Sequence, residues 1–142
     1  MIPRRRLLRA LDANINRSRE GLRVTEDLVR FCLERPALFR RLRRVRHALD
    51  VEVRKLPATS FELARARDSA QDPGREARAS SARSIEHLLL MNLQRTKEAL
   101  RVVEEASRLL APARAAAFQR LRFQTYDIER DLLLLLAALR HH

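Results

Sequence analysis

The chain has very few of the residues that interrupt, cross-link or stack within a fold. Its 142 residues include two glycines, five prolines, one cysteine and no tryptophan, and aromatic residues make up 4%. Scarce glycine and proline with abundant Ala, Leu, Arg and Glu favour helices, whereas a β-sandwich would need more β-branched and aromatic residues. The single cysteine, Cys32, excludes an internal disulfide and fits a reducing compartment.

Several signatures of known chemistry are also missing. The sequence has no Walker-type glycine-rich loop, no GxGxxG, no Cys/His metal cluster and no readable Ser-His-Asp arrangement. No secretory signal opens it, and the apolar run from Leu132 to Leu139 is far shorter than the ~20 residues of a spanning helix. We therefore expect that run to be a buried helix end, and the protein to be cytoplasmic without membrane contact.

Acidic charge is in short supply, with 18 acidic residues against 30 basic ones and a formal net charge of +12. Lys55 and Lys97 are the only lysines. Arginine prefers bidentate contact with carboxylate and phosphate, which points to a polyanionic partner, either a nucleic acid or a small phosphorylated molecule. One tyrosine and five phenylalanines offer little base stacking, which disfavours nucleic acid. The other interpretation, favoured for most exposed arginines, is a genome that encodes Arg where others encode Lys.

One segment occurs twice in the chain. Residues Asn14 to Asp27 and Asn92 to Glu105 share Asn, Arg, Glu, Leu, Arg, Val and Glu in the same order, at a constant offset of 78 residues. A further match at an offset of 76 pairs Pro36-Ala37 with Pro112-Ala113, and Val45-Arg46-His47 with Leu121-Arg122-Phe123. The repeat unit is thus a long segment, a proline break and a second long segment.

This pattern predicts an all-α fold, a bundle of four long helices built from two similar helix-hairpin repeats with an irregular connecting segment. A single helical domain spans 1–142, with repeat one at about 7–56, the loop at about 57–83 and repeat two at about 84–140. A pseudo-two-fold axis relates the repeats, and ligand sites in such bundles lie between facing helices. The expected helices run from Pro3 to about Glu34, from about Ala37 to Lys55, from the N-cap Ser84 to about Leu110, and from about Ala113 to Leu139, with a short one at 61–66.

A helical projection at about 100° per residue places Asn14 and Arg17 inside the apolar arc of the first helix, and Asn92 and Arg95 inside that of the third. A buried arginine is costly unless it is paired or meets an anion. We favour a polar pocket between the helices; the other interpretation is that these groups only tie helices together. Gly21 and its counterpart Ala99 would let a backbone or a ligand approach closely. The projection also puts Phe31 and Cys32 on the apolar side and Glu26 on the polar side.

The segment from Asp12 to Asp27 resembles the opening signature of a helical domain of thiamine biosynthesis. That domain is regarded as an alternative hydroxymethylpyrimidine-phosphate kinase and is often fused ahead of thiamine-phosphate synthase (thiamine-phosphate pyrophosphorylase). Further segments match: Val45-Arg46-His47, Arg67-Asp68 with Asp72 and Gly74, and Asn92 to Glu105 followed by Leu121-Arg122. Val45 and Pro73 depart from the usual Leu and Val. The synthase barrel is absent, so we interpret the chain as a stand-alone form or an excised domain.

The resemblance implies phosphoryl transfer from ATP to hydroxymethylpyrimidine phosphate, giving the pyrophosphate that the synthase uses. Such chemistry needs positioning and charge neutralisation. We assign catalytic roles to Arg17, Arg95 and Asp68, and a Mg²⁺ site to Asp68 and Asp72. Substrate or phosphate binding is assigned to Asn14, Arg46, His47, Arg67, Asn92 and Arg122. Glu20 and Glu98 are weaker candidates.

Each assignment has a structural alternative. Glu20 and Glu98 would only pair with Arg23 and Arg101, Arg46 and Arg122 would clamp carboxylates between repeats, Asp68 and Asp72 would cap the loop, and His47 would be a core histidine. The alternative function is a non-catalytic module that binds a phosphorylated pyrimidine or thiamine phosphate and acts with thiamine-phosphate synthase. A homodimer through a Leu- and Ala-rich face is a further expectation, and His141-His142 are given no role.

Overall fold

A computed structural model describes residues 1–77 and 81–140. This part of the chain contains no strand and five α-helices, which are α1 (Arg4–Asp27), α2 (Pro36–Arg54), α3 (Ser60–Ala66), α4 (Ile85–Leu110) and α5 (Ala115–Leu139). The all-helical class is confirmed. The described residues form five helices and not four: the four long ones of the predicted bundle, and α3, which corresponds to the short helix predicted at 61–66. Residues 78–80 of the predicted loop and His141-His142 lie outside the described residues.

The helix boundaries follow from local capping chemistry. Ser84 accepts a hydrogen bond from the backbone N–H of His87 and so starts α4 where the sequence predicts. Thr59 and Glu62 form a capping box at the start of α3. Pro36 occupies the first position of α2, where its missing N–H leaves no bond unmade. The second proline break, at Pro112, forms a short 3₁₀ turn, Pro112–Arg114, before α5.

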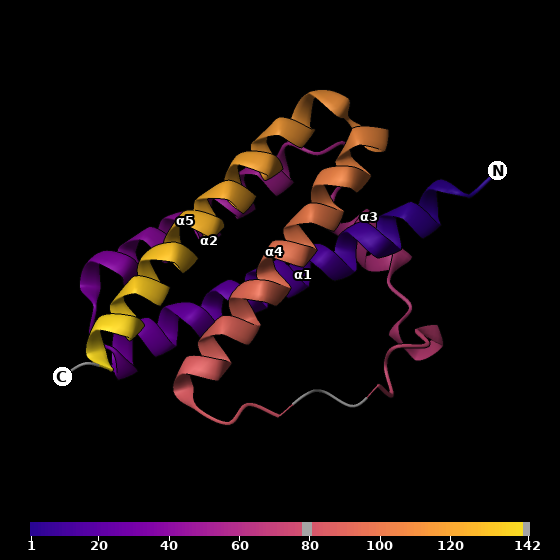
Figure 1. Ribbon diagram of the computed structural model, residues 1–142. Coiled ribbons are helices and arrows are strands. Elements are labelled where there is room, and N and C mark those ends of the chain that lie inside the picture. The colour runs from indigo at the N-terminus through magenta and orange to yellow at the C-terminus, as the bar shows by residue number, and fades with distance from the viewer. Residues whose placement is uncertain (78–80, 141–142) are drawn as a thin grey trace.

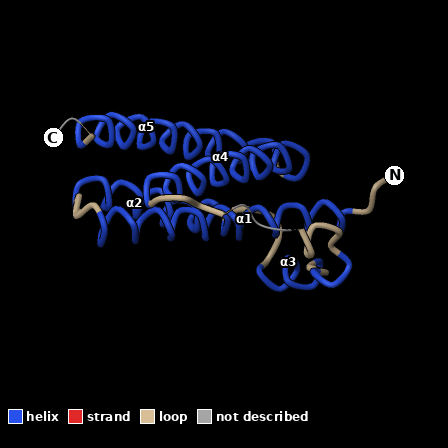
Figure 2. The backbone as a smooth tube through the Cα atoms, turned by 60° about the horizontal axis from the view of Figure 1, so that its bottom comes forward, coloured by secondary structure: helices blue, strands red, loops and turns tan. Residues whose placement is uncertain are grey.

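The four long helices form two stacked hairpins. We call α1 with α2 repeat one, and α4 with α5 repeat two. Figure 2 shows the two hairpins as two layers, with α3 beside the first half of α1, and Figure 1 shows α4 lying across α1 and α5 over α2. The core between the layers holds fully buried side chains from all four helices, namely Leu11, Ile15, Leu22, Leu42, Leu49, Leu89, Leu93, Leu100, Phe118, Ile128 and Leu132.

At Gly21 the helices α1 and α4 lie close together. A Cβ atom added there would lie 2.2 Å from Thr96 Oγ1 and 3.1 Å from the carbonyl oxygen of Asn92. The predicted close approach at Gly21 is therefore made by the neighbouring helix. Its repeat counterpart Ala99 is also buried.

The end of the first helix differs from the ideal projection. Leu28–Cys32 forms a π turn, in which the backbone N–H of Leu33 donates to the carbonyl of Leu28, and Glu34 then adopts a left-handed conformation with φ 54°. The wider turn shifts the register of the residues that follow. As a result Phe31 and Cys32 are exposed, so their assignment to the core was wrong.

The apolar end of α5 is buried on one side only. Leu132 and Leu136 face the core, while Leu133, Leu134 and Leu139 are exposed, so the expectation of a buried helix end holds for one face of α5 only. Within the described ranges, no helix combines the length and the apolar character that crossing a membrane requires.

Candidate functional site

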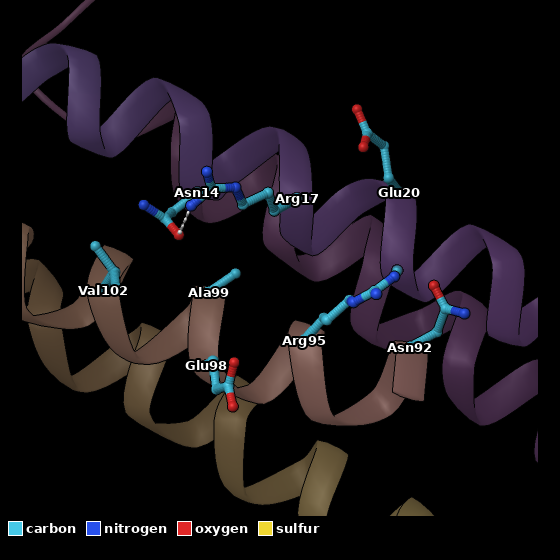
Figure 3. Close-up of a pocket in the computed structure, with 9 residues that line it drawn as sticks. Asn14, Arg17, Glu20, Asn92, Arg95, Glu98, Ala99 and Val102 are labelled. Carbon is cyan, nitrogen blue, oxygen red and sulfur yellow. Dashed lines mark hydrogen bonds between the residues drawn. The ribbon is translucent and has the colours of Figure 1, made fainter. Parts of the chain in front are cut away.

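A cleft of about 540 Å³ lies between α1 and α4, where the two repeats face each other. We call it the α1/α4 cleft. Eight of its residues are repeat counterparts, paired as Asn14 with Asn92, Arg17 with Arg95, Glu20 with Glu98, and Gly21 with Ala99; Val102 completes the lining. Figure 3 shows these side chains arising from the two facing helices. The duplicated motif thus builds one shared cleft.

The two asparagines are held in the same way. Asn14 and Asn92 are 7% and 9% exposed, and each donates its Nδ2 to the carbonyl four residues earlier, Ala10 or Leu88, at 2.8 Å. Ser18 and Thr96 donate to the carbonyls of Asn14 and Asn92 at 2.7 Å. Because the amide nitrogen is fixed by its own helix, the side-chain oxygen is left as the free acceptor, and in Asn14 it takes a long hydrogen bond of 3.4 Å from Arg17.

The two arginines line the cleft but are exposed, which corrects the expectation of a buried side chain. Their Cα atoms lie on the inner side of each helix, yet a long side chain can extend along the surface to water. In Figure 3 Arg17 and Arg95 extend toward opposite ends of the cleft, each toward the asparagine of its own helix. Neither forms an ion pair with any carboxylate of the described residues. The cleft therefore holds two guanidinium charges free to meet an anion.

The two glutamates of the motif do not neutralise these arginines. In Figure 3 Glu20 points away from α4 and Glu98 away from α1, and Glu98 accepts a hydrogen bond from Gln94 at 2.9 Å. The alternative pairing with Arg23 and Arg101 is wrong, because Arg23 lies 3.6 Å from Asp27 and Arg101 lies 3.3 Å from Glu105.

A second cleft, of about 510 Å³, adjoins the first and is closed on one side by the connecting segment. We call it the loop cleft. It shares Asn14 and Arg17 with the α1/α4 cleft and adds the loop residues Arg67, Asp68, Ser69 and Asp72. The structure thus brings five sequence-predicted site residues together around Arg17: Asn14, Arg17, Arg67, Asp68 and Asp72.

The two loop carboxylates also shape the loop. Asp68 accepts a hydrogen bond from the backbone N–H of Gln71 at 3.3 Å, and Asp72 accepts one from Gly74 at 2.8 Å. The capping alternative is therefore correct as a description of one oxygen of each group. The other oxygen has no hydrogen bond to a described residue, and the described residues contain no group of three His, Cys, Asp or Glu side chains suited to a metal.

The partner of Arg67 is Asp12, which is not among the predicted site residues. The Arg67 guanidinium donates from Nε and Nη2 to the two carboxylate oxygens of Asp12, at 2.8 and 2.9 Å, and these bonds hold the pKa of Arg67 above its ordinary value. Asp12 is buried. The repeat shows Asp12 to be unusual, because the residue at the 78-residue offset is the apolar Leu90.

Arg46 and Arg122 lie apart from the α1/α4 cleft and hold buried carboxylates. Arg46 binds Glu26, with Nη2 3.1 Å from Oε1 and a shorter contact from Nε, and Arg122 binds Glu104 at 3.0 Å. Both carboxylates are 1% exposed, so the placement of Glu26 on the polar side was wrong. Each pair joins the two helices within one repeat, which differs from the alternative of a clamp between repeats.

The buried pair of repeat two is reinforced by a second arginine. Burial alone would raise the pKa of Glu104, but hydrogen bonds from Arg122 and Arg108 outweigh it and hold that pKa below its usual range. Arg108 donates at 2.8 Å. In repeat one the corresponding hydrogen bond raises the pKa of Arg46 above its ordinary value.

His47 is exposed on α2 and lines neither cleft. The alternative of a core histidine was therefore wrong. Its predicted part in substrate binding has no geometric support from the position it occupies.

Comparison with known proteins places the chain in a family. The model of the ThiD2 family matches residues 9–131. Thiamine-phosphate synthase of Synechocystis sp. is 39% identical over 130 residues, which cover 89% of this chain and 36% of that protein. The synthase of Nostoc punctiforme is 40% identical over 128 residues, covering 88% and 35%.

Thiamine-phosphate synthase of Rhodopirellula baltica is 36% identical over 138 residues, covering 95% of this chain and 36% of that protein. The chain therefore spans about a third of the length of the curated relatives it matches. No solved structure matches it. On the extent of the family match, this chain belongs to the ThiD2 family.

Proposed function

We propose that this chain acts in thiamine biosynthesis and phosphorylates hydroxymethylpyrimidine phosphate to its pyrophosphate, using ATP. The ThiD2 membership and the thiamine-phosphate synthases among its relatives support the pathway. The observation that carries the reaction is the pairing of Arg17 and Arg95 in one cleft, each without a carboxylate partner among the described residues.

The chemistry suits a site built from positive charge. The bond between the γ-phosphorus of ATP and its bridging oxygen breaks, and a bond forms from that phosphorus to an oxygen of the acceptor phosphate. Two anionic substrates must approach each other, so repulsion between them is the main obstacle, and catalysis rests on positioning and charge neutralisation. Arg17 and Arg95, from opposite walls, would hold the two phosphate groups together through charge-assisted hydrogen bonds.

The asparagines orient the site. Asn14 accepts a hydrogen bond from Arg17 at 3.4 Å and so directs that guanidinium along the cleft. Its counterpart Asn92 is fixed in the same way by its own helix, which leaves its side-chain oxygen to accept from the amino group of the pyrimidine or from Arg95. Gly21 and Ala99, one turn after each arginine, line the cleft, and Gly21 lets α4 approach α1 closely there.

The loop carboxylates fit a magnesium ion bound together with the nucleotide. Mg²⁺ keeps several waters and is usually held by one or two carboxylates plus substrate phosphates, and Asp68 and Asp72 each retain one oxygen for this after capping their turns. The ion would neutralise charge on the phosphates of ATP. Asp68 and Asp72 would hold it, and Arg17, which lines the same loop cleft, would bind the phosphoryl group beside it.

A second candidate is a module that binds the phosphorylated pyrimidine or thiamine phosphate without turnover and acts with thiamine-phosphate synthase. One observation favours it: the carboxylates of the α1/α4 cleft, Glu20 and Glu98, point away from its centre. A cleft lined by arginine and asparagine side chains, with its carboxylates turned outward, suits the binding of an anion, which requires no further catalytic group.

The test is an assay of the purified chain with the monophosphate, ATP and Mg²⁺, read by mass spectrometry as the gain of one phosphoryl group. We expect product, and a loss of about 100-fold or more in kcat/KM for Arg17→Ala, the range seen when one preorganised charge-stabilising group is removed. Arg23→Ala is the matched control, because Arg23 lies on the same helix, pairs with Asp27 and lines neither cleft.

Three outcomes separate the candidates. Product formation that Arg17→Ala abolishes and Arg23→Ala preserves supports the kinase. Calorimetric binding of the monophosphate without product selects the binding module. The absence of both overturns the two candidates together.

A further inference from the structure

The two repeats differ sharply at one place on the rim of the cleft. At the position of Asp12 in repeat one, repeat two has the apolar Leu90. The carboxylate of Asp12 on α1 is only 6% exposed. Asp12 lies about one turn before Asn16, which also lines the loop cleft. A buried carboxylate is costly unless its oxygens are satisfied, so a residue that breaks the repeat in this way needs a reason.

The reason in the structure is the connecting segment. Asp12 binds Arg67 through both oxygens, at 2.8 and 2.9 Å, in the planar bidentate geometry that gives an arginine pair its strength and direction. Asn16 adds a hydrogen bond to the same carboxylate at 3.3 Å. Arg67 is the first residue after α3, and Asp68 follows it directly. The segment that carries Asp68 and Asp72 is thus fastened to α1 at its first residue.

A second contact fixes the same edge of the loop. Arg9, one turn before Asp12 on α1, donates to the backbone carbonyl of Asp68 at 3.2 Å. The two contacts use the side chain of Arg67 and the backbone of Asp68, so the Asp68 carboxylate oxygen that does not cap the turn remains without a hydrogen bond to a described residue. Asp68 lines the loop cleft together with Arg17.

We infer that Asp12 is a positioning residue: by gripping Arg67 it sets the loop carboxylates Asp68 and Asp72 against Arg17, at the end of the site that receives the magnesium-bound polyphosphate of the nucleotide. Arg67 then acts as a structural tie and makes no contact with phosphate. The loop follows repeat one only, so the pseudo-symmetric cleft has one metal–nucleotide end, at Arg17, and one end for the acceptor phosphate, at Arg95. This inference rests on the proposed function.

The most direct variant for a test is Asp12→Leu. It introduces the residue that repeat two has at this position and removes the ion pair with Arg67 without leaving a buried polar group. We expect KM for the magnesium–nucleotide complex to rise about tenfold or more, as is typical when a residue that orients metal ligands is removed, with KM for the monophosphate unchanged. Asp50→Asn is the control, because Asp50 on α2 also pairs with an arginine of α1, Arg19, at 2.6 Å, and lines neither cleft.

Limited trypsin digestion provides a readout that needs no activity. Trypsin must take the arginine side chain into its own pocket, so the grip of Asp12 protects the bond after Arg67. We expect Asp12→Leu to speed cleavage between Arg67 and Asp68 severalfold over the unchanged chain and over Asp50→Asn. Circular dichroism and a thermal melt establish that the helices of the variant remain folded.

Arg67→Ala and the double variant separate a tie from a phosphate ligand. If Arg67 acts only through Asp12, the double variant has the same KM as Asp12→Leu, whereas a further loss in the double variant shows direct phosphate contact and overturns the inference. Unchanged cleavage or unchanged nucleotide KM in Asp12→Leu also overturns it.

If the unchanged chain shows no turnover, the proposed reaction fails while this inference remains testable. Calorimetric affinity for ATP with Mg²⁺ then replaces KM: a loss in Asp12→Leu supports the positioning role, and equal affinities, or no binding by the unchanged chain, overturn it.

Discussion

In repeat one Glu26 is held by Arg46, whereas in repeat two Glu104 is held by both Arg122 and Arg108. Both halves keep the carboxylate and the arginine of the partner helix. In repeat two Arg108 adds a second hydrogen bond, whereas its counterpart Arg30 lies over the rings of Phe31 and Phe39. In each repeat one arginine from the second helix of the hairpin binds this glutamate, so the duplicated glutamate serves the packing of each hairpin.

Other equivalent positions keep their geometry while changing their chemistry. Arg19 pairs with Asp50 at 2.6 Å, and its counterpart Lys97 pairs with Glu129 at 2.8 Å and lies 4.5 Å from the ring centre of Tyr126, which stands where repeat one has Asp50. A cation is retained on the first helix and a favourable partner on the second. The Asn and Arg of the cleft are among the residues that stay identical, and, unlike Glu26 and Glu104, they are not demanded by packing alone.

The largest expected effect comes from breaking a buried pair. Glu104→Ala removes the partner of Arg122 and leaves its buried guanidinium without compensation, which typically costs about 3–5 kcal/mol of the unfolding free energy. Glu26→Ala should cost less, because the Arg46 side chain is 19% exposed against 10% for Arg122. Urea unfolding followed by circular dichroism measures both losses.

Glu105 offers the matched control for that comparison. Its side chain is 49% exposed, and it pairs with Arg101 and Arg108 on the surface of α4. Such pairs are worth about 0–1 kcal/mol. If Glu105→Ala destabilises the chain as much as Glu104→Ala, the buried pairs have no special part in the fold.

A smaller effect is expected where the two repeats touch. Gly21→Ala places a methyl group 2.2 Å from Thr96 Oγ1 and 3.1 Å from a backbone carbonyl, and such overpacking costs about 1–3 kcal/mol, which exceeds the roughly 1 kcal/mol gained in helix propensity. Ala99→Gly should lose about 1 kcal/mol through propensity. Thermal or urea unfolding tests both.

A second substitution, at Thr96, tests the contact at Gly21 more sharply. Thr96→Ala removes the nearest atom, so it should restore part of the stability lost in Gly21→Ala. A gain in stability from Gly21→Ala alone would show that α1 and α4 are not in close contact there.

The smallest effect is a dependence of stability on pH in repeat two. The pKa of Glu104 is lowered in the folded protein by Arg122 and Arg108 despite its burial. Its ionised form therefore stabilises the fold fully above the unfolded pKa of about 4.3, and this contribution is lost as pH falls through the lower folded pKa. The difference in unfolding free energy between the unchanged chain and Glu104→Gln should shrink below about pH 4. A difference independent of pH would contradict the lowered pKa.

The sequence was most informative where the repeat and the helical period agreed. The helical period predicts an inner stripe of α2 at Leu38, Leu42, Val45, Leu49 and Val53, and all of these but the half-buried Leu38 are buried. Asn14 and Asn92 lie on the inner face as expected. These positions can be predicted from one helix alone, because its own apolar pattern shows which side faces the neighbouring helices.

The sequence failed where a partner from elsewhere in the chain decides the outcome. Glu26 is polar, so its projection suggested solvent, but Arg46 from the next helix allows it to be buried. Cys32 left the core because a π turn changed the helical register. Arg17 lies at an inward position of α1 and was expected to be buried, but its long side chain extends along the cleft and is exposed. Asp12 was overlooked because its partner, Arg67, is 55 residues away.

The central claim is that both repeats form one shared ligand site. Calorimetric titration with hydroxymethylpyrimidine phosphate tests this claim most directly. We predict that one monophosphate binds per chain, with an affinity that falls by about 1.5–3 kcal/mol in Arg95→Ala, the worth of hydrogen bonds to a charged group, and that changes little in Arg17→Ala, because the Arg17 end receives the nucleotide. Two independent sites per chain, each lost with only one of the arginines, would contradict it.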